Sequence, residues 1–166
     1  MLTAERLREV LEYVPTTGIF YWKVSRGPSW PAGRPAGCIN KVIGYCVIRF
    51  ERKLYFAHRL AWLWMTGEWP KDEIDHRDTD RANNKWANLR EATHAENMKN
   101  VRRRANNTSG KKGVYRHQNK WRARIRINGI IHHIGMFDDI ERAAAEYNLA
   151  ATRLHGEFAR NNEIGV

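Results

Sequence analysis

One stretch decides which fold the first part of the chain is expected to have. It comprises residues 73–100, with the sequence EIDHRDTDRANNKWANLREATHAENMKN. An isoleucine precedes Asp75 and His76, a loop rich in Asn, Asp and Arg follows, and a helix-like run contains Asn97. Phosphodiester hydrolysis needs a base that activates the nucleophile and a cation near the leaving oxygen. Histidine supplies a base at neutral pH. Carboxylate and amide oxygens suit hard Mg²⁺ or Mn²⁺, so the composition of this stretch is typical of a metal-dependent hydrolase.

The same stretch resembles the HNH endonucleases, which have a ββα-metal fold, in the form found among phage homing endonucleases. The resemblance rests on Asp-His, then Asn-Leu-Arg, then Thr-x-x-Glu-Asn, in this order and spacing. It implies that His76 is the general base and that Asn88 orients its ring. It also implies that Asp75 and Asn97 hold one Mg²⁺ or Mn²⁺ ion per active site.

The preceding run GYCVIRFERKLYFAHRLAWLWMTGEWP, residues 44–70, is similar to the segment that leads into the Asp-His pair of phage HNH proteins. Two further histidines leave alternatives open. His58 opens the helix expected in this run and is either a buried structural residue or a DNA contact. His94, three residues before Asn97, is a second possible metal ligand or phosphate contact.

The net charge of +11 is concentrated in one band of the chain. Residues 97–137 contain 11 basic side chains and no acidic one, whereas residues 1–96 contain 15 basic and 12 acidic side chains. A solvated basic face is the alternative, but so many positive charges without a counter-charge favour a polyanionic partner. Because the band has a strand pattern and not that of an amphipathic helix, nucleic acid fits better than a membrane surface.

Composition excludes several other classes of protein. Hydrophobic residues make up 42% of the chain and include seven tryptophans, which is enough for packed cores. No apolar run approaches the roughly 20 residues that span a bilayer, and residues 1–14 resemble an amphipathic helix and not a signal peptide. We therefore expect a cytoplasmic protein. Cys38 and Cys46 lack a CxxC partner and are expected to be reduced thiols.

We expect an α+β chain with an N-terminal domain over residues 1–98, a basic linker over 99–107 and a C-terminal domain over 108–166. Helical and strand periodicities predict the elements of both domains. In the first they are helix 2–13, strands 19–24, 42–50 and 54–57, and helix 58–67. In the second they are three strands within 113–137, with turns at Gln118-Asn119 and Asn128-Gly129, and a helix over 140–155 that Asp138 or Asp139 caps and Gly156 ends.

The run KWRARIRI, residues 120–127, predicts a strand with two different faces. Because side chains alternate along a strand, Arg122, Arg124 and Arg126 share one face. The other face carries Trp121, Ala123, Ile125 and Ile127 and is expected to pack against the alanine-rich helix. Arginine binds both phosphates and guanine edges through two parallel hydrogen bonds, so the arginine face is a candidate surface for DNA.

Residues 108–160 resemble the Apetala-type (ethylene-response-factor) DNA-binding domain in the runs KGVY, GMFDD and AAAEYNLAA and in the Trp-x-Ala-x-Ile strand. That resemblance implies a three-stranded sheet backed by one helix, with the sheet in the major groove. The plant pattern favours Arg where Tyr115 and His117 stand and Trp at His133, so the target sequence is not transferred. The candidate DNA-binding residues are Tyr115, Arg116, His117, Arg122, Arg124, Arg126 and His133, together with the linker residues Arg102, Arg103 and Arg104.

These expectations combine into a site-specific, homing-type DNA endonuclease of phage or intron origin, in which the first domain cuts and the second chooses where. It is expected to act on double-stranded DNA as a monomer or homodimer, nicking or cutting both strands, and to leave 5′-phosphate and 3′-hydroxyl ends. The alternative is a sequence-specific DNA-binding regulator with an inactive HNH fold. An RNA-directed enzyme is a weaker alternative, because the expected sheet lacks paired aromatic residues for stacking unpaired bases.

Overall fold

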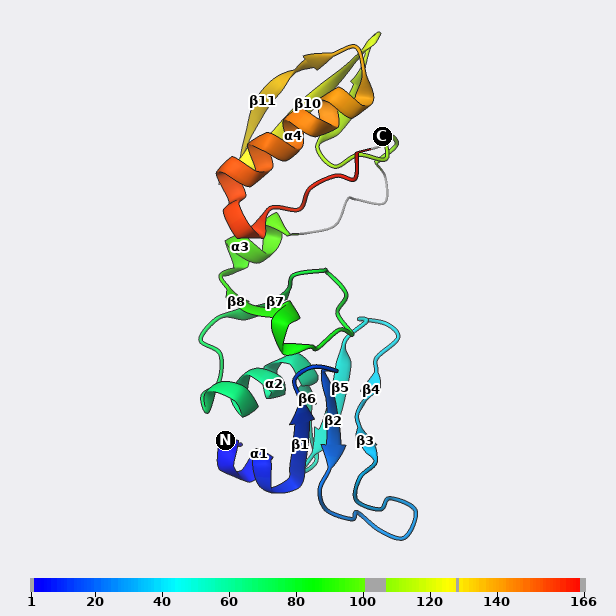
Figure 1. The fold of residues 1–166 in the computed structure, drawn as a ribbon, viewed down its shortest axis with the longest axis vertical. Coiled ribbons are helices and arrows are strands. Elements are labelled where there is room, and N and C mark those ends of the chain that lie inside the picture. Colours follow the sequence, from blue (N-terminus) through cyan, green and yellow to red (C-terminus); the bar gives the residue numbers. More distant parts are fainter. Residues whose placement is uncertain (1, 101–106, 128, 165–166) are drawn as a thin grey trace. The chain divides into compact units, whose positions relative to one another are not determined.

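The computed structural model describes residues 2–100, 107–127 and 129–164, and the chain forms two compact units, Met1–Thr93 and His94–Val166 (Figure 1). Both units combine helices with small antiparallel sheets, which confirms the α+β prediction. The helix over residues 94–99, expected at the end of the nuclease domain, belongs to the second unit. Linker residues Arg102, Arg103 and Arg104 lie outside the described residues.

The first unit opens with helix α1 (Ala4–Val10), whose first turn is capped by the Thr3 hydroxyl accepting from the Arg6 amide. The predicted helix extended to residue 13, but Leu11–Val14 forms strand β1. This strand pairs antiparallel with β2 (Ile19–Trp22), which in turn pairs with β3 (Pro35–Ala36). Pairing with the next strand thus overrides the local helical periodicity.

A second sheet follows, with β4 (Cys38–Ile39), β5 (Cys46–Phe50) and β6 (Lys53–Phe56) in this order. The predicted strand over 42–50 is shorter in the structure, because the Asn40 side chain accepts from the Val42 and Ile43 amides and holds a turn there. Helix α2 (Ala57–Thr66) comes next. It ends at Gly67, as predicted, and the φ of 86° at Gly67 is the left-handed conformation of a helix-ending glycine. Both cysteines are free thiols, as predicted.

Strands β7 (Glu73–His76) and β8 (Leu89–Ala92) form an antiparallel hairpin, with the short 3₁₀ helix η1 (Trp86–Asn88) before β8. The core of this unit draws on all of its helices and strands except β4. Its largest fully buried side chains are Leu7, Leu11, Tyr13, Phe20, Ile48, Leu60 and Leu63. None of the described helices is long and apolar enough to cross a membrane.

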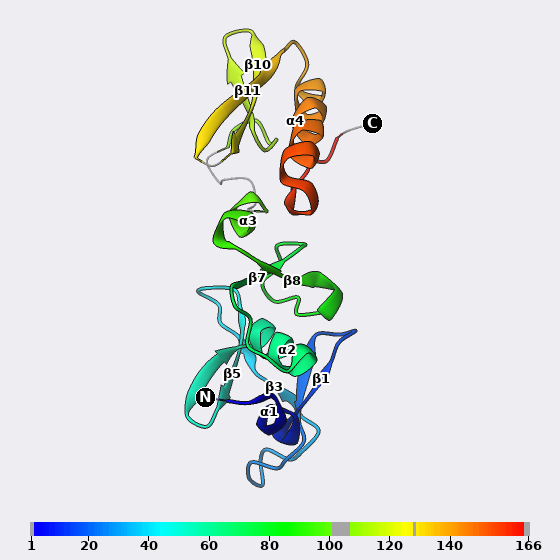
Figure 2. The same cartoon turned by 90° about the vertical axis from the view of Figure 1, so that its left-hand side faces the viewer.

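The second unit contains α3 (His94–Lys99), β9 (Val114–His117), β10 (Lys120–Ile127), β11 (Ile130–Phe137), α4 (Ile140–His155) and the 3₁₀ helix η2 (Gly156–Phe158). The sheet is antiparallel in the order β11-β10-β9, and α4 covers one of its faces (Figure 2). The bounds of α4 match the prediction, and the Asp139 carboxylate caps it by accepting from the Arg142 amide. Asn128, in the predicted Asn-Gly turn, lies outside the described residues.

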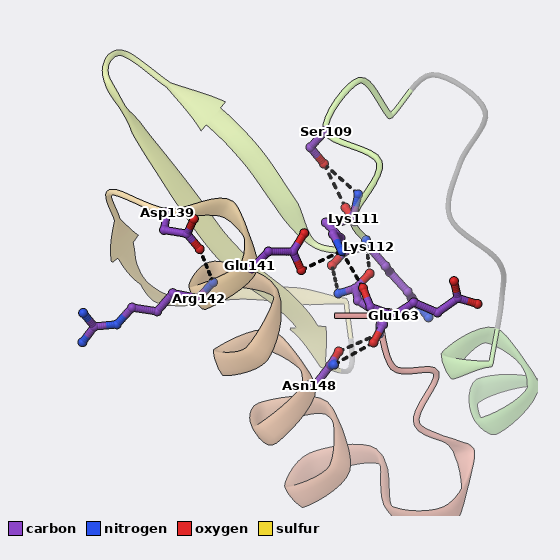
Figure 3. Close-up of polar contacts among 9 residues, drawn as sticks. Ser109, Lys111, Lys112, Asp139, Glu141, Arg142, Asn148 and Glu163 are labelled. Atoms are coloured by element: carbon purple, nitrogen blue, oxygen red, sulfur yellow. Dashed lines mark hydrogen bonds and ion pairs between the residues drawn. The ribbon is translucent and has the colours of Figure 1, made fainter. Parts of the chain in front are cut away.

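Polar contacts hold the end of the chain against α4 and the loop before β9 (Figure 3). The Lys111 ammonium lies 2.8 Å from a Glu141 carboxylate oxygen and also donates to the Glu163 carbonyl. The Asn148 and Asn162 residues exchange two hydrogen bonds, and the Asn162 amide bonds the backbone of Lys112. These contacts fix the loop that delivers β9 to the sheet.

Candidate active site and basic sheet

Strand β7 places Asp75 and His76 side by side in the hairpin, and both side chains are buried. The His76 Nε2 atom lies 3.2 Å from the Asn84 Oδ1 atom. An amide oxygen only accepts hydrogen bonds, so this contact selects the tautomer protonated at Nε2. A neutral imidazole of that tautomer has its basic lone pair on Nδ1, which is the form that a general base requires.

The Asn84 side chain is itself held from several directions. Its Nδ2 atom donates to the Ala82 carbonyl at 3.1 Å, and its backbone carbonyl accepts from the buried Tyr13 hydroxyl at 2.6 Å. The backbone of Gly18 also approaches so closely that an added Cβ atom would lie 2.4 Å from the Asn84 carbonyl carbon. Tyr13 of β1 and Gly18 of the β1–β2 turn thus determine which amide of the loop faces the histidine.

Asn88 has a different position from the one that the family resemblance implied. Its side chain donates to Asp78 Oδ1 at 2.9 Å and to the Asn83 carbonyl at 2.8 Å, and accepts from the Asp78 amide at 3.0 Å. Asn83 closes the same network by donating to Asp78 at 2.6 Å. Asn88 therefore fixes the loop that carries Asn84, the residue whose side chain contacts the His76 ring.

The rings of Tyr45, His58 and His76 lie against one another. The His58 and His76 ring centroids are 5.0 Å apart in an edge-to-face arrangement, and Tyr45 lies 5.0 Å from His58 and 5.9 Å from His76. His58 is only 6% exposed, so of its two predicted roles the buried structural one fits the geometry. Among the described residues its Nδ1 atom has no hydrogen-bond partner.

Burial keeps both histidines neutral. Burial, with smaller contributions from the neighbouring His76 and Arg59, lowers the pKa of His58 to about 3. Burial also lowers the pKa of His76, whereas the Asn84 hydrogen bond and the carboxylates of Asp78, Asp75 and Asp80 act against it. At pH 7 the His76 ring is therefore able to accept a proton.

Asp75 forms a buried ion pair across the hairpin. Its Oδ2 atom accepts from Arg90 Nε at 2.8 Å and from Arg90 Nη2 at 2.6 Å, and the two residues are register partners in β7 and β8. The two side chains are 5% and 7% exposed, respectively. The two parallel hydrogen bonds fix the direction of the Asp75 carboxylate next to His76.

The donor chemistry of the predicted metal ligands fits a hard cation, because Asp75 offers a carboxylate and Asn97 an amide oxygen. Mg²⁺ commonly takes one or two protein carboxylates and completes its shell with water and phosphate. Within residues 2–100, 107–127 and 129–164, no three His, Cys, Asp or Glu side chains form a metal-binding group. Asn97 and the exposed His94 lie on α3 in the second unit, so pairing either with Asp75 stays a prediction.

In the second unit, the sheet separates its side chains as the alternation predicted. Ala123 and Ile125 are buried against α4, and Arg122, Arg124 and Arg126 lie on the opposite face. The register places further candidates on the arginine face: Tyr115 opposite Arg122, His117 opposite Lys120, and His133 opposite Arg124. The guanidinium carbon of Arg124 lies 4.2 Å from the Tyr115 ring centroid.

Arg116 is the exception among the predicted DNA-binding residues of this sheet. It alternates with Tyr115 and His117 along β9, and its guanidinium carbon lies 5.1 Å from the Trp121 ring centroid. Its Nε atom donates to the Gln118 carbonyl at 3.0 Å, within the β9–β10 turn. Arg116 therefore does not share the face of the three strand arginines.

The site thus consists of a buried histidine and an adjacent carboxylate on a β-hairpin. This part of the chain also matches a known family of nucleases. Residues 55–99 match the family model described as HNH endonuclease. The chain is 40% identical over 123 residues to "Uncharacterized HNH endonuclease L560" of Acanthamoeba polyphaga mimivirus, covering 73% of this chain and 64% of that protein. It is 35% identical over 106 residues to "Protein 3.8" of Escherichia phage T7, covering 62% of this chain and 87% of that protein.

The chain is therefore similar to HNH endonucleases over residues 55–99, and both of these relatives come from viruses. It spans about two thirds of the length of the mimivirus relative. The matched segment contains α2, the β7–β8 hairpin and α3, and so includes His58, Asp75, His76 and Asn97.

Proposed function

We propose that this protein is a metal-dependent, site-specific DNA endonuclease of the phage homing type, acting in the cytoplasm of a host cell. The observation that carries the proposal is the His76–Asn84 contact at 3.2 Å, because it sets the tautomer of a buried base beside the Asp75 carboxylate. A degenerate nuclease is expected to lose its base or a ligand first, and Asp75, His76 and Asn97 are all present.

In the proposed reaction, the Nδ1 atom of His76 takes a proton from a water molecule as that water attacks the phosphorus atom. The bond from phosphorus to the 3′ oxygen breaks, which leaves a 5′-phosphate and, once the 3′ oxygen has gained a proton from water, a 3′-hydroxyl. Asp75 and Asn97 would hold one Mg²⁺ or Mn²⁺ ion, which supplies positive charge for the departing oxygen. Arg90 fixes the direction of the Asp75 carboxylate through two hydrogen bonds.

The second unit is proposed to bind the duplex through the arginine face of its sheet. Arg122, Arg124 and Arg126 follow one another on that face, and residues 97–137 contain no acidic side chain to neutralise them. The resemblance to the Apetala-type domain supports binding in the major groove, with Tyr115, His117 and His133 beside the arginines. Arg102, Arg103 and Arg104 are proposed to follow the DNA backbone.

The rival function is that of a sequence-specific DNA-binding regulator with an inactive nuclease fold. Incubation of the whole protein with supercoiled plasmid or phage genomic DNA, with Mg²⁺, Mn²⁺ or EDTA, separates the two. Nicked or linear products that need the cation support the endonuclease, and the same gel shows whether one or both strands are cut. Binding of duplex DNA without cleavage under either cation supports the regulator.

A further inference from the structure

The arginine face of the sheet also contains apolar side chains in a regular arrangement. Ile131 is 40% exposed and lies opposite Arg126 in the β10–β11 register, and Met136 is 44% exposed and lies opposite Arg122. Directly opposed residues of an antiparallel pair share a face, with Cβ atoms about 4.5–5.5 Å apart. Two of the three strand arginines thus have an exposed aliphatic neighbour.

These two side chains do not belong to the core of the unit. That core lies on the other face, where Ala123, Ile125 and the helix α4 pack together. Contact between an exposed aliphatic side chain and water is unfavourable. Lys, Thr or Glu would suit a sheet face that stays in solvent at least as well. The position of Ile131 and Met136 beside the arginines therefore indicates a surface that becomes covered together with them.

The charge of this face identifies what covers it. Three arginines without an acidic side chain in the same segment complement a polyanion, and an acidic duplex satisfies them with phosphates and guanine edges. In the major groove, guanine presents two acceptors that suit arginine, and thymine presents a C5-methyl group that suits an apolar side chain. An arginine beside an aliphatic residue is thus complementary to a guanine beside a thymine.

We propose that Ile131 and Met136 are specificity-determining residues that contact the C5-methyl groups of thymines next to the guanines bound by Arg126 and Arg122. The inference rests on the proposed function of the sheet and adds the chemical identity of the bases that it reads. The central pair differs, because Arg124 is opposite His133 and lies over the Tyr115 ring. The two thymine contacts are therefore expected to flank the centre of the site.

The test uses the methyl group itself. Duplexes that the whole protein retains from a random pool in EDTA, where it binds without cutting, are sequenced, and the best site is remade with deoxyuridine in place of individual thymidines. This change removes only the C5-methyl and keeps the base pairing. Burial of one such group is worth roughly a fourfold change in affinity, so we expect about a fourfold weaker complex at each contacted thymine.

Variants assign each contact to its residue. Met136→Ser and Ile131→Ser should each bind the thymidine duplex more weakly and become indifferent to uracil at one position. Ile130→Ser is the matched control: Ile130 is 65% exposed, but it is opposite Ile127 and alternates away from the arginine face. This control should keep the full preference for thymidine.

Three failures are distinguishable. If the protein enriches a site but binds its uracil and thymidine forms equally, the methyl contacts are wrong and duplex binding by the sheet stands. If Ile130→Ser loses the preference as fully as Met136→Ser, the assignment to the arginine face is wrong. If no duplex is retained at all, the proposed function of the sheet fails, and the inference fails with it.

Discussion

The Nε2 atom of His76 lies 3.2 Å from the Oδ1 atom of Asn84, and this contact joins the hairpin to the loop between its strands. The loop in turn is fixed by Tyr13, whose hydroxyl donates to the Asn84 carbonyl from 71 residues earlier in the chain. The orientation of the proposed base therefore depends on the packing of the whole first unit and not on the HNH segment alone.

The first prediction concerns Asn84. Replacement by Ala removes the acceptor for the Nε2 proton, so the single-turnover cleavage rate should fall by roughly 10- to 100-fold, as for other residues that orient a functional histidine. Duplex affinity should stay unchanged. Asn84→Asp keeps an acceptor and should retain more of the rate than Asn84→Ala. If Asn88→Ala lowered the cleavage rate more than Asn84→Ala, Asn88 and not Asn84 would be the residue that orients His76.

The second prediction concerns the buried Asp75–Arg90 pair, in which the atoms Oδ2 and Nη2 are 2.6 Å apart. Arg90→Ala leaves a buried carboxylate without its guanidinium and should lower the free energy of unfolding by about 3–5 kcal/mol. Urea unfolding followed by tryptophan fluorescence measures this change, because six of the seven tryptophans lie in the first unit. The exposed Arg6, which pairs with Glu9 and Glu51, provides the control, and Arg6→Ala should change the free energy of unfolding far less than Arg90→Ala. Equal effects of the two variants would contradict the importance of the buried pair.

A third prediction follows from the buried histidines. The pKa of His58 is lowered from 6.5 to about 3, so below pH 6.5 the unfolded chain binds a proton that the folded chain does not. Stability should therefore fall as the pH drops below 6.5, with about 2 kcal/mol lost to His58 alone at pH 5. The lowered pKa of His76 acts in the same direction. Urea midpoints between pH 7.5 and 5 measure the effect, and His58→Phe should reduce this pH dependence. If the stability of His58→Phe depended on pH as strongly as that of the unmodified protein, the assignment of this effect to His58 would be wrong.

The fourth prediction compares two glycines in the loop before β9. Both have positive φ, 73° at Gly113 and 76° at Gly110, but an added Cβ atom at Gly113 would lie 2.1 Å from the Tyr147 ring, and nothing lies within 4 Å at Gly110. Gly113→Ala should destabilise the second unit by about 3 kcal/mol, and Gly110→Ala by about 1 kcal/mol. Thermal melts followed by circular dichroism test the difference; similar melting temperatures for the two variants would contradict it.

The fifth prediction is the salt dependence of duplex binding. If around six phosphates are neutralised, affinity should fall by roughly a thousandfold between 50 and 200 mM salt. Arg126→Ala should lower the slope of log affinity against log salt by about 1 if Arg126 contacts a phosphate, and should leave the slope unchanged if it contacts only a base. A flat response of the unmodified protein would rule out the electrostatic account of the basic band.

Local signals predicted the second unit well. Helix α4 has the expected bounds because its Asp139 cap and its terminal Gly156 act within one turn of the chain. The alternation in β10 also predicted which residues are buried under that helix. By contrast, the end of the helix predicted over 2–13 was wrong, because Leu11–Val14 pairs with β2, and the helical spacing of residues 2–13 does not show this pairing.

The candidate site was predictable only in part. The Asp-His spacing identified Asp75 and His76, but three loop residues, Asn83, Asn84 and Asn88, are equivalent as amides in the sequence. Tyr13 and Gly18 select Asn84 among them, and neither belongs to the motif. The partner of Asp75 was likewise missed, because Arg90 reaches it through the register of β7 and β8.

The most direct test of the account is the single-turnover cleavage rate of duplex DNA with Mg²⁺ for the unmodified protein and for His76→Ala. His132→Ala is the matched control, since His132 is exposed and has no proposed role. We expect His76→Ala to bind the duplex normally and to cleave at least roughly a hundredfold more slowly, with His132→Ala unaffected. Cleavage by His76→Ala at the rate of the unmodified protein would contradict the role of His76 as the base.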